Sequence, residues 1–297
     1  MKILITGAAG RIGRATYIRL AAEHQVIGLD SAPSSTSDHV GSIEDVEALR
    51  AALSGVNAVV HVAALHAPHV GHVAEEVFEA INVAATIRLA RLAGEAGVRS
   101  FVFTSTTALY GSASTRNDQA AWIDEETVPQ PRTIYHRTKL KAEKLLQEIA
   151  LKTGLSVTAI RMSRCFPEPA PIMAAYRLHR GIDVRDVADV HAIAALAPSP
   201  GFRRFVVSGR TPFLPEDRAL LLNNAPEVIE MRCPQLAKAF RRRHWPLPIS
   251  IDRVYSPTHA SSELNWEPKY GYEEVLAQLD RRSLEVLPPR HDWCPEE

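Results

Sequence analysis

The stretch KILITGAAGRIG, residues 2–13, decides the fold of this chain. Its apolar half, Lys2 to Thr6, predicts a short buried strand that runs into a glycine-rich turn. Gly7, Gly10 and Gly13 are spaced G-x-x-G-x-x-G; glycines permit a tight turn, close approach of the backbone to a pyrophosphate, and close packing of helix on strand. The helix that follows offers free N–H groups and a partial positive charge to phosphates. The stretch therefore predicts a dinucleotide-binding strand–turn–helix, the alternative being glycines that only make a turn.

Strands and helices alternate beyond this stretch, up to Arg161. Such alternation implies right-handed crossovers and a parallel sheet covered by helices on both faces. The fold class predicted is α/β, a Rossmann-type doubly wound parallel sheet with a small C-terminal substrate-binding part. The expected strands are Lys2–Thr6, Gln25–Leu29, Ala58–Val62, Phe101–Thr104, Ser156–Ile160 and Phe202–Val207, and the expected helices are Arg11–Glu23, Ile43–Leu53, Val73–Ala96, Tyr135–Lys152 and Val187–Leu196.

The regular alternation ends after Arg161, where three prolines within residues 167–171 indicate an irregular segment. We assign residues 1–161, together with about 182–208, to the NAD-binding domain. Residues 162–181 and 209–285 form the expected substrate-binding region, packed on the first domain. The charged, proline-containing segment 286–297 is expected to be a loose tail.

Composition excludes several classes of protein. Lys+Arg and Asp+Glu both number 34, so the zero formal charge indicates neither a nucleic-acid nor a membrane partner. No apolar run reaches membrane-spanning length, and the chain starts without a charged leader. The three cysteines are far apart, with no CxxC spacing, which indicates reduced thiols in a cytoplasmic protein. The basic run 241–243 is interpreted as a solvated helix end rather than an anion site.

Asp30 closes the second expected strand, where an acidic side chain binds the ribose hydroxyls of NAD and repels the 2′-phosphate of NADP. The cofactor predicted is therefore NAD. Two alternatives stay open: Asp30 as a turn former before Ser31, and Arg11 and Arg14 as partners of a 2′-phosphate.

Tyr135 and Lys139 lie four residues apart, so they share one face of the expected helix. Tyrosine is a poor base at neutral pH unless its pKa falls from about 10. A lysine one turn away can lower it. With a cofactor loop upstream, this pair predicts a redox enzyme; an ordinary exposed helix start is the alternative.

Together these motifs resemble the extended short-chain dehydrogenase/reductase family, in its NAD-dependent epimerase/dehydratase branch. The resemblance covers about residues 1–280. It is carried by GAAGRIG, Asp30, HVAA at residues 61–64, FTSTTALYG at 103–111, YHRTK at 135–139 and ELNWEP at 263–268, where Asn265 replaces the family's glycine.

The resemblance implies a role for each matching residue. Tyr135 is expected to be the acid/base, Lys139 to hold the nicotinamide ribose and lower the tyrosine pKa, and Thr106 to bind the reacting oxygen. Asn82 matches a helix asparagine near the active site. The family's aspartate near the adenine is replaced by Ser42, so this contact is expected to be weaker or made by backbone. The expected cofactor-binding residues are Gly7, Gly10, Arg11, Ile12, Gly13, Asp30, Ser42, Ile43, Ala63, Ala64, Thr104, Tyr135 and Lys139.

The segment after Arg161 points to a small substrate. Only about twenty residues separate Arg161 from the run IDVRDVADVH, which leaves little chain to grip a nucleotide, and RMSRCFPEP resembles the corresponding stretch of uronate dehydrogenases. Met173 stands where those enzymes place a carboxylate-binding arginine. We therefore expect Arg164 or Arg177 to hold an anionic group, with surface arginines as the alternative. The expected substrate-binding residues are His66, Thr106, Thr107, Arg164 and Arg177.

Three histidines follow the third expected strand, at positions 66, 69 and 72. No carboxylate or cysteine completes a metal-ligand set, so no metal is expected. They are interpreted as loop residues, with His66 as a possible substrate contact.

The function predicted is hydride transfer between NAD and a secondary hydroxyl of a sugar, sugar acid or similar small substrate. The first alternative is a nucleotide-sugar epimerase such as a UDP-glucose 4-epimerase-like enzyme, and the distant one a non-catalytic NAD sensor. By resemblance, helices 73–96 and 135–152 are expected to pair across a two-fold axis in a homodimer; otherwise they simply cover the sheet.

Overall fold

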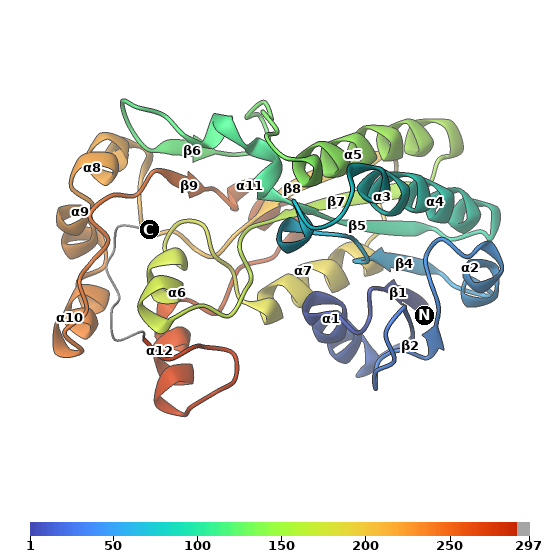
Figure 1. Cartoon of the computed structure of the whole chain (residues 1–297), viewed down its shortest axis with the longest axis horizontal. Helices are drawn as coiled ribbons and strands as arrows, with labels where there is room; N and C mark the ends of the chain where they lie inside the picture. The colour runs from blue at the N-terminus through green and yellow to red at the C-terminus, as the bar shows by residue number, and fades with distance from the viewer. Residues whose placement is uncertain (290–297) are drawn as a thin grey trace. The chain divides into compact units, whose positions relative to one another are not determined.

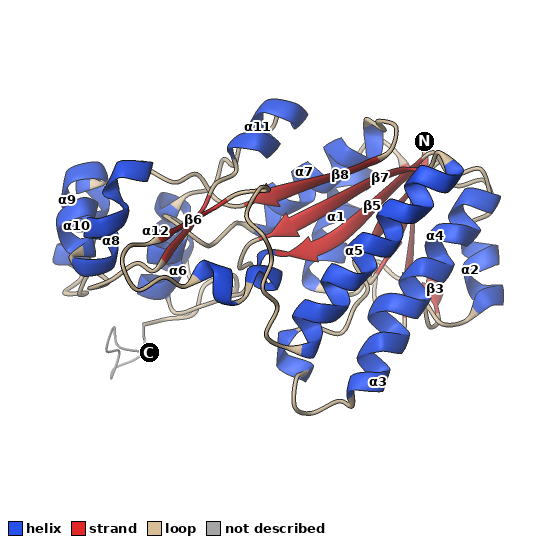
Figure 2. Cartoon of the chain, turned by 90° about the horizontal axis from the view of Figure 1, so that it is seen from above, coloured by secondary structure: helices blue, strands red, loops and turns tan. Residues whose placement is uncertain are grey.

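The computed structural model describes residues 1–289, and its central feature is a parallel seven-stranded sheet of order β3-β2-β1-β4-β5-β7-β8 (Figure 2). The predicted α/β class is confirmed. The strands are β1 (Lys2–Thr6), β2 (Gln25–Asp30), β3 (His39–Val40), β4 (Ala58–His61), β5 (Ser100–Thr106), β7 (Ser156–Met162) and β8 (Phe202–Val207). Only the two-residue strand β3 was not expected.

The strand order reverses at β1, which lies between β2 and β4. Ile3 is in register with Val26 of β2 and with Ala58 of β4, and both pairings are parallel. The chain leaves β1 and β4 at the same carboxyl edge, where open α/β sheets bind their ligands. This switch point places the glycine loop after β1 beside the HVAA segment of β4.

Helices cover both faces of this sheet, and Figure 1 shows α4 and α5 on the face opposite α1 and α7. Their bounds are α1 (Arg11–Ala21), α2 (Val46–Ala52), α4 (Thr86–Glu95), α5 (Ile134–Thr153) and α7 (Val184–Leu196). The core under α2, α4 and α5 is built from alternate strand residues such as Leu4, Val59 and Phe101. Successive residues of β5 reach opposite faces: Thr104 bonds to His191 of α7, and Ser105 to Glu143 of α5.

The helix expected over Val73–Ala96 is divided. It starts later, as α3 (Glu75–Phe78), because the Val73 N–H donates to the His69 carbonyl in the preceding turn. A π-helical segment, η2 (Glu79–Ala85), then joins α3 to α4. Such wider turns are often found at functional sites.

The chain forms two compact units. The first comprises residues 1–109, 130–161 and 187–205, and the second comprises 110–129, 162–186 and 206–297. These boundaries lie close to the expected ones except for 110–129, which carries strand β6 (Ala121–Ile123) of a second, two-stranded parallel sheet with β9 (Arg253–Tyr255). Local sequence patterns cannot predict that β6 pairs with a strand about 130 residues further along the chain.

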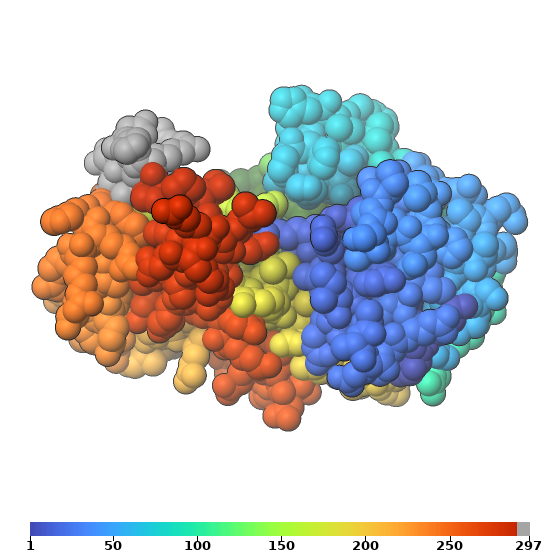
Figure 3. Space-filling model, turned by 90° about the horizontal axis from the view of Figure 1, so that it is seen from below, coloured from blue at the N-terminus to red at the C-terminus, as the bar shows by residue number. Residues whose placement is uncertain are grey.

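The second unit is more helical than its sequence indicated. It has its own core, which includes Met173, Phe213 and Phe240. In Figure 3 the orange segment from α8 to α10 and the red segment ending at α12 form a continuous surface. Its helices are α6 (Ala170–Tyr176), α8 (Arg218–Asn223), α9 (Ala225–Arg232), α10 (Pro234–Arg242), α11 (Thr258–Leu264) and α12 (Tyr272–Asp280).

The start of the expected loose tail is ordered, so this expectation was wrong for residues 286–289. Val286 is buried in the second core. The Leu287 N–H donates to the Glu168 carbonyl at 3.0 Å, and the Ala170 N–H donates to the Leu287 carbonyl at 3.0 Å. The remainder, 290–297, lies outside the described residues, as does Cys294. Cys165 and Cys233 are buried free thiols.

Candidate active site

The glycine loop is held where only glycine fits. A Cβ on Gly13 would lie 2.0 Å from the Gly7 carbonyl oxygen, and one on Gly7 would lie 2.6 Å from the Ala63 nitrogen. Gly7 also has a φ of 73°, which favours glycine. Helix α1 starts after Gly10 with no side-chain cap and no acidic residue in its first turn. Its first N–H groups are thus free of side-chain acceptors, and the loop fits a pyrophosphate.

Asp30 links the second strand to this loop. One carboxylate oxygen accepts a hydrogen bond from the Ala9 N–H at 2.9 Å, and the other accepts one from the Ala32 N–H at 2.9 Å. Each oxygen keeps a second lone pair, so both the turn role and a ribose contact are compatible with the geometry.

Tyr135 lies in the first turn of α5, which is capped by the hydroxyl of Thr133. Its side chain lies near that of Thr106, at the end of β5, and the Thr106 hydroxyl opposes the rise of the Tyr135 pKa. Thr106 Oγ1 accepts from the Ala108 N–H at 3.1 Å, so its own proton remains available for donation. Two residues expected to act on one oxygen are therefore adjacent.

Lys139 is buried one turn further along α5. Its ammonium group donates to the Thr104 carbonyl at 2.9 Å and lies 4.6 Å from the centre of the Phe103 ring. Burial lowers the pKa of Lys139 to about 7, against the opposing effect of Glu143.

The expectation that Lys139 lowers the Tyr135 pKa is not met by the chain's own groups. Burial raises the pKa of Tyr135 to about 12, and only the Thr106 hydrogen bond opposes it. The reason is that the lysine points to the Thr104 carbonyl, and its own lowered pKa weakens its field near neutral pH.

A buried ion pair behind the lysine was missed by the sequence interpretation. Glu143 receives hydrogen bonds from Arg161 of β7, the shortest 2.6 Å, and from the Ser105 hydroxyl at 2.5 Å. Arg161 is fully buried. The available signals were Glu143 one turn after Lys139, and a charged residue within an otherwise apolar strand.

Two expected site residues at the end of β5, Thr104 and Thr107, are buried. The Thr104 hydroxyl meets His191 Nε2 at 2.9 Å; since His191 Nδ1 lies 2.7 Å from the Val187 carbonyl, the threonine is assigned as the donor. Its expected cofactor contact can therefore come only through the lysine that its carbonyl holds.

Asn82, in the π-helical segment, holds the loop after β4. Its amide accepts from the Leu65 N–H at 2.8 Å and donates to the Leu65 carbonyl at 2.9 Å and to the Thr138 hydroxyl at 3.3 Å. It thus ties the segment after Ala63 and Ala64 to helix α5, in agreement with its expected place near the active site.

The other expected residues of this unit divide into exposed and buried. Ser42 is exposed and accepts from the Glu44 N–H at 3.1 Å, whereas Ile43 is buried in the sheet core. His66 is half-buried, and its pKa is lowered by burial and then by the charges of His69 and Lys139. Among residues 1–289, no group of His, Cys, Asp and Glu has the arrangement of a metal site.

The two arginines expected to bind an anion are in the second unit and differ sharply. Arg177 is buried, with its guanidinium 3.3 Å from Asp183. Arg164 keeps 48% of its side chain exposed and pairs with Glu168. The structure therefore favours a structural ion pair for Arg177 and leaves Arg164 accessible.

The sequence profile of the NAD dependent epimerase/dehydratase family matches residues 3–170, more than half of the chain. The chain belongs to this family. It is accordingly an enzyme whose cofactor is NAD, as the sequence predicted, and the interpretation as a non-catalytic sensor is set aside.

Individual relatives are more distant. An uncharacterised UDP-glucose epimerase, YtcB of Bacillus subtilis (strain 168), is 30% identical over 208 residues, which are 60% of this chain and 61% of that protein. The match thus spans less than two thirds of the relative's length.

Solved structures share the fold at low identity. A short-chain dehydrogenase/reductase superfamily protein from Agrobacterium tumefaciens with bound NAD is 21% identical, with a TM-score of 0.71 over 95% of this chain and 97% of that one. A mutated uronate dehydrogenase is 18% identical, with a TM-score of 0.66 over 100% of this chain and 89% of that one. Both likenesses establish the fold alone. No helix among residues 1–289 is long and apolar enough to cross a membrane.

Proposed function

We propose that this enzyme transfers hydride between NAD and a secondary hydroxyl of a sugar, sugar acid or similar small substrate. The observation that carries the proposal is the placement of Tyr135 near Thr106, with Lys139 buried one turn along the same helix. A phenol, a hydroxyl donor and an ammonium group are the groups needed to move a proton to or from an alcohol oxygen.

The chain's own residues divide this work. Tyr135 takes the proton of the substrate hydroxyl, while Thr106 donates its free proton to the reacting oxygen. Lys139 holds the ribose next to the nicotinamide. The nicotinamide ring of NAD, when bound, supplies the hydride acceptor. General base action contributes roughly 10²–10⁴-fold, and positioning supplies much of the rest.

The cofactor is held by the loop and strand ends already described. The N–H groups at Arg11, Ile12 and Gly13 receive the pyrophosphate, and Asp30 receives the adenosine ribose. Ala63 and Ala64 line the cofactor, and Ser42 and Ile43 flank the adenine, mainly through backbone since Ile43 is buried.

The substrate is proposed to be small and to carry an anionic group. Arg164 is the accessible arginine for it. His66 lies near Lys139 and is a substrate contact, whereas buried Thr107 acts by fixing the end of β5. Arg177 is retained only as the buried support of this region, because its charge is balanced by Asp183.

A sugar epimerase is the second candidate, favoured by the 30% identity to a protein described as a UDP-glucose epimerase. An epimerase returns the hydride to the other face of the sugar, so NAD is not consumed. With NAD⁺ and substrate added, absorbance that grows at 340 nm identifies a dehydrogenase, and conversion of the sugar without that growth identifies an epimerase.

The test of the assignment is Tyr135→Phe, which removes the phenol proton carrier and keeps the ring. We expect turnover to fall by about 10²–10⁴-fold, with NAD affinity within twofold of the wild type. Tyr17→Phe on α1 removes another tyrosine hydroxyl, one that bonds to Asp38, and should leave turnover unchanged. Full turnover in Tyr135→Phe would refute the role of Tyr135.

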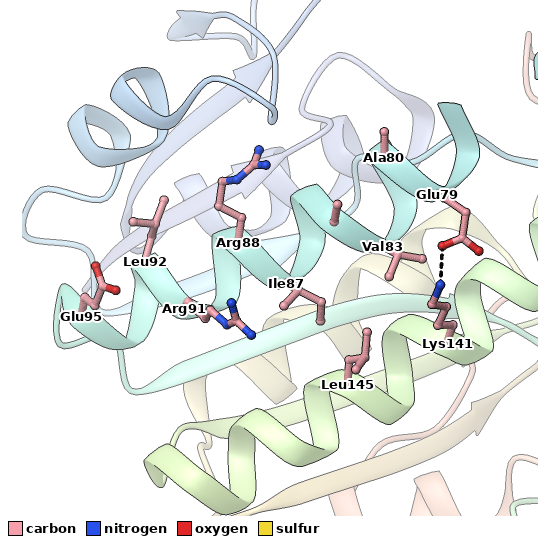
Figure 4. Close-up of a pocket in the computed structure, with 11 residues that line it drawn as sticks. Glu79, Ala80, Val83, Ile87, Arg88, Arg91, Leu92, Glu95, Lys141 and Leu145 are labelled. Carbon is pink, nitrogen blue, oxygen red and sulfur yellow. Dashed lines mark hydrogen bonds and ion pairs between the residues drawn. The ribbon is translucent and has the colours of Figure 1, made fainter. Parts of the chain in front are cut away.

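We also propose a homodimer that resides in the cytoplasm. Helices α4 and α5 border a groove with apolar residues such as Val83, Ile87 and Leu145 on its floor (Figure 4). Its rim carries both positively and negatively charged side chains, including a Lys141–Glu79 ion pair of 2.8 Å. A surface of mixed charge around an apolar floor can pair with a second copy of itself.

A further inference from the structure

Arg164 and Arg180 are brought side by side by the backbone of the second unit. The Arg164 N–H donates to the Arg180 carbonyl at 3.0 Å, and the Ile182 N–H donates to the Arg164 carbonyl at 2.9 Å. These bonds form a parallel bridge between Arg164 and Gly181. The separation of the two arginines is therefore fixed by main-chain geometry rather than by flexible loops.

Both guanidinium groups lie over one aromatic ring. The central carbon of Arg180 is 4.1 Å from the centre of the Tyr176 ring, and that of Arg164 is 5.8 Å from it. Arg164 also lies 5.4 Å from the ring of Phe166, which is 42% exposed. Cation–π contacts at these distances hold the charges in place without using their N–H donors.

The donors of Arg180 have no acceptor among residues 1–289. Its Nε is buried and makes no hydrogen bond. The nearest carboxylate oxygen, on Asp252, is 3.7 Å away, and Asp252 accepts from Arg253 Nε at 3.0 Å. Only 28% of the Arg180 side chain is exposed. A guanidinium so placed loses hydration and gains only the 3.7 Å contact with Asp252 in exchange, which is unfavourable unless a ligand supplies a closer acceptor.

The surrounding charges leave an excess of positive charge. Arg164, Arg180 and Arg253 are balanced by two carboxylates, Glu168 and Asp252. The neighbouring His179 adds no charge, because burial, followed by the effect of Arg180, lowers its pKa to about 3.

We propose that Arg164 and Arg180 form an oxyanion-binding site, and that its ligand is the carboxylate of a sugar acid. This inference rests on the proposed function for the choice of a sugar acid, while the site itself rests on the Arg180 donors, which make no hydrogen bond within residues 1–289. It assigns to Arg180 the part that the sequence interpretation gave to Arg177. A phosphate group offers the same oxygen geometry, and the experiment separates the two sources.

The test measures binding to the full chain saturated with NAD, by titration calorimetry, with four probes: D-glucuronate, D-glucose, UDP-glucose and inorganic phosphate. We expect the wild type to bind glucuronate and not glucose. Arg180→Ala and Arg164→Ala should each weaken glucuronate binding by about 10- to 100-fold, the range for one charge-assisted hydrogen-bonded contact.

Control variants test whether a loss of glucuronate binding comes from misfolding, and whether it is independent of the role proposed for Tyr135. Arg242→Ala removes an exposed positive charge from α10 and should leave binding unchanged. NAD affinity should be the same in every variant, and Tyr135→Phe should still bind glucuronate even though it does not turn over. Glucuronate affinity unchanged in both arginine variants, or a wild type that binds no anion, would overturn the site. If UDP-glucose or phosphate bound through these arginines and glucuronate did not, the assignment of a carboxylate ligand would be overturned and a phosphate ligand supported.

Discussion

Lys139 is buried and Tyr135 is partly buried, and burial favours the uncharged form of each side chain. The pKa of Tyr135 rises to about 12 and that of Lys139 falls to about 7. The only opposing influences within the chain are the Thr106 hydrogen bond on the tyrosine and the charge of Glu143 on the lysine. Near neutral pH the lysine is therefore close to its titration midpoint, whereas the phenol stays protonated.

Two buried histidines of the first unit predict acid sensitivity. Burial lowers the pKa of His61 to about 3 and that of His191 to about 4. Below pH 6.5 these two histidines bind protons in the unfolded chain but stay neutral in the folded one. The stability that the folded protein gains from keeping them neutral is therefore present above pH 6.5 and is lost as the pH falls toward 4. We expect each histidine to lower the free energy of unfolding by about 2 kcal/mol at pH 5 relative to pH 7.

Urea unfolding of the first unit at pH 7 and pH 5 measures this loss. His72→Gln, at an exposed position, should keep the full pH dependence. An equal urea midpoint at both pH values would contradict the buried neutral histidines, since most carboxylates titrate below this window.

At the level of elements, α5 carries two of the proposed catalytic residues and the buried carboxylate behind them. Tyr135, Lys139 and Glu143 follow one another at four-residue spacing and so share a face against β5 and β7. Glu143 is locked by Arg161 and Ser105. The ion pair thus joins α5 to β7, and the Ser105 hydrogen bond joins it to β5.

Removing one partner of this pair should destabilise the protein strongly. We expect Glu143→Ala to cost about 3–5 kcal/mol of unfolding free energy, because it leaves the Arg161 charge buried and unpaired. The double variant Glu143→Leu with Arg161→Met should recover most of this loss. Glu148→Ala, on the exposed side of α5, should change stability by less than about 0.5 kcal/mol.

Chemical denaturation followed by circular dichroism gives these values. If Glu143→Ala were no less stable than Glu148→Ala, the pair would not be the buried anchor of α5. A double variant as unstable as the single one would show that shape, rather than unpaired charge, causes the loss.

The elements of the first unit were predictable, since its strands are apolar runs and its helices are amphipathic. The helices of the second unit were not predictable in this way. Its helices, such as α6 with Pro171 in the first turn and α9 with Pro226, begin at prolines that suggested irregular chain. Proline is well suited to the first turn of a helix. From the sequence alone, a proline that starts a helix cannot be distinguished from one that interrupts regular structure, because the difference depends on how the following residues pack.

For the whole molecule, the proposed dimer can be disrupted at the groove between α4 and α5. Ala84 lines this groove and is exposed, so Ala84→Glu should place a charge in the interface without disturbing the fold. Light scattering coupled to gel filtration should show a dimer for the wild type and a shift to monomer for the variant. Ala51→Glu, exposed on α2, is the matched control. A wild-type monomer, or a variant that stays dimeric, would exclude this face.

The sequence by itself determined the fold class, the NAD loop and the family, because these depend on local patterns: glycines that no Cβ could replace, apolar strands, and a Tyr/Lys pair at helical spacing. Tertiary structure alone decided the rest. It buried Arg177 against Asp183, left the Nε of Arg180 without a hydrogen bond, and joined Glu143 to Arg161. Charge pairing and burial arise between residues far apart in the chain or on different faces of a turn, so spacing does not fix them.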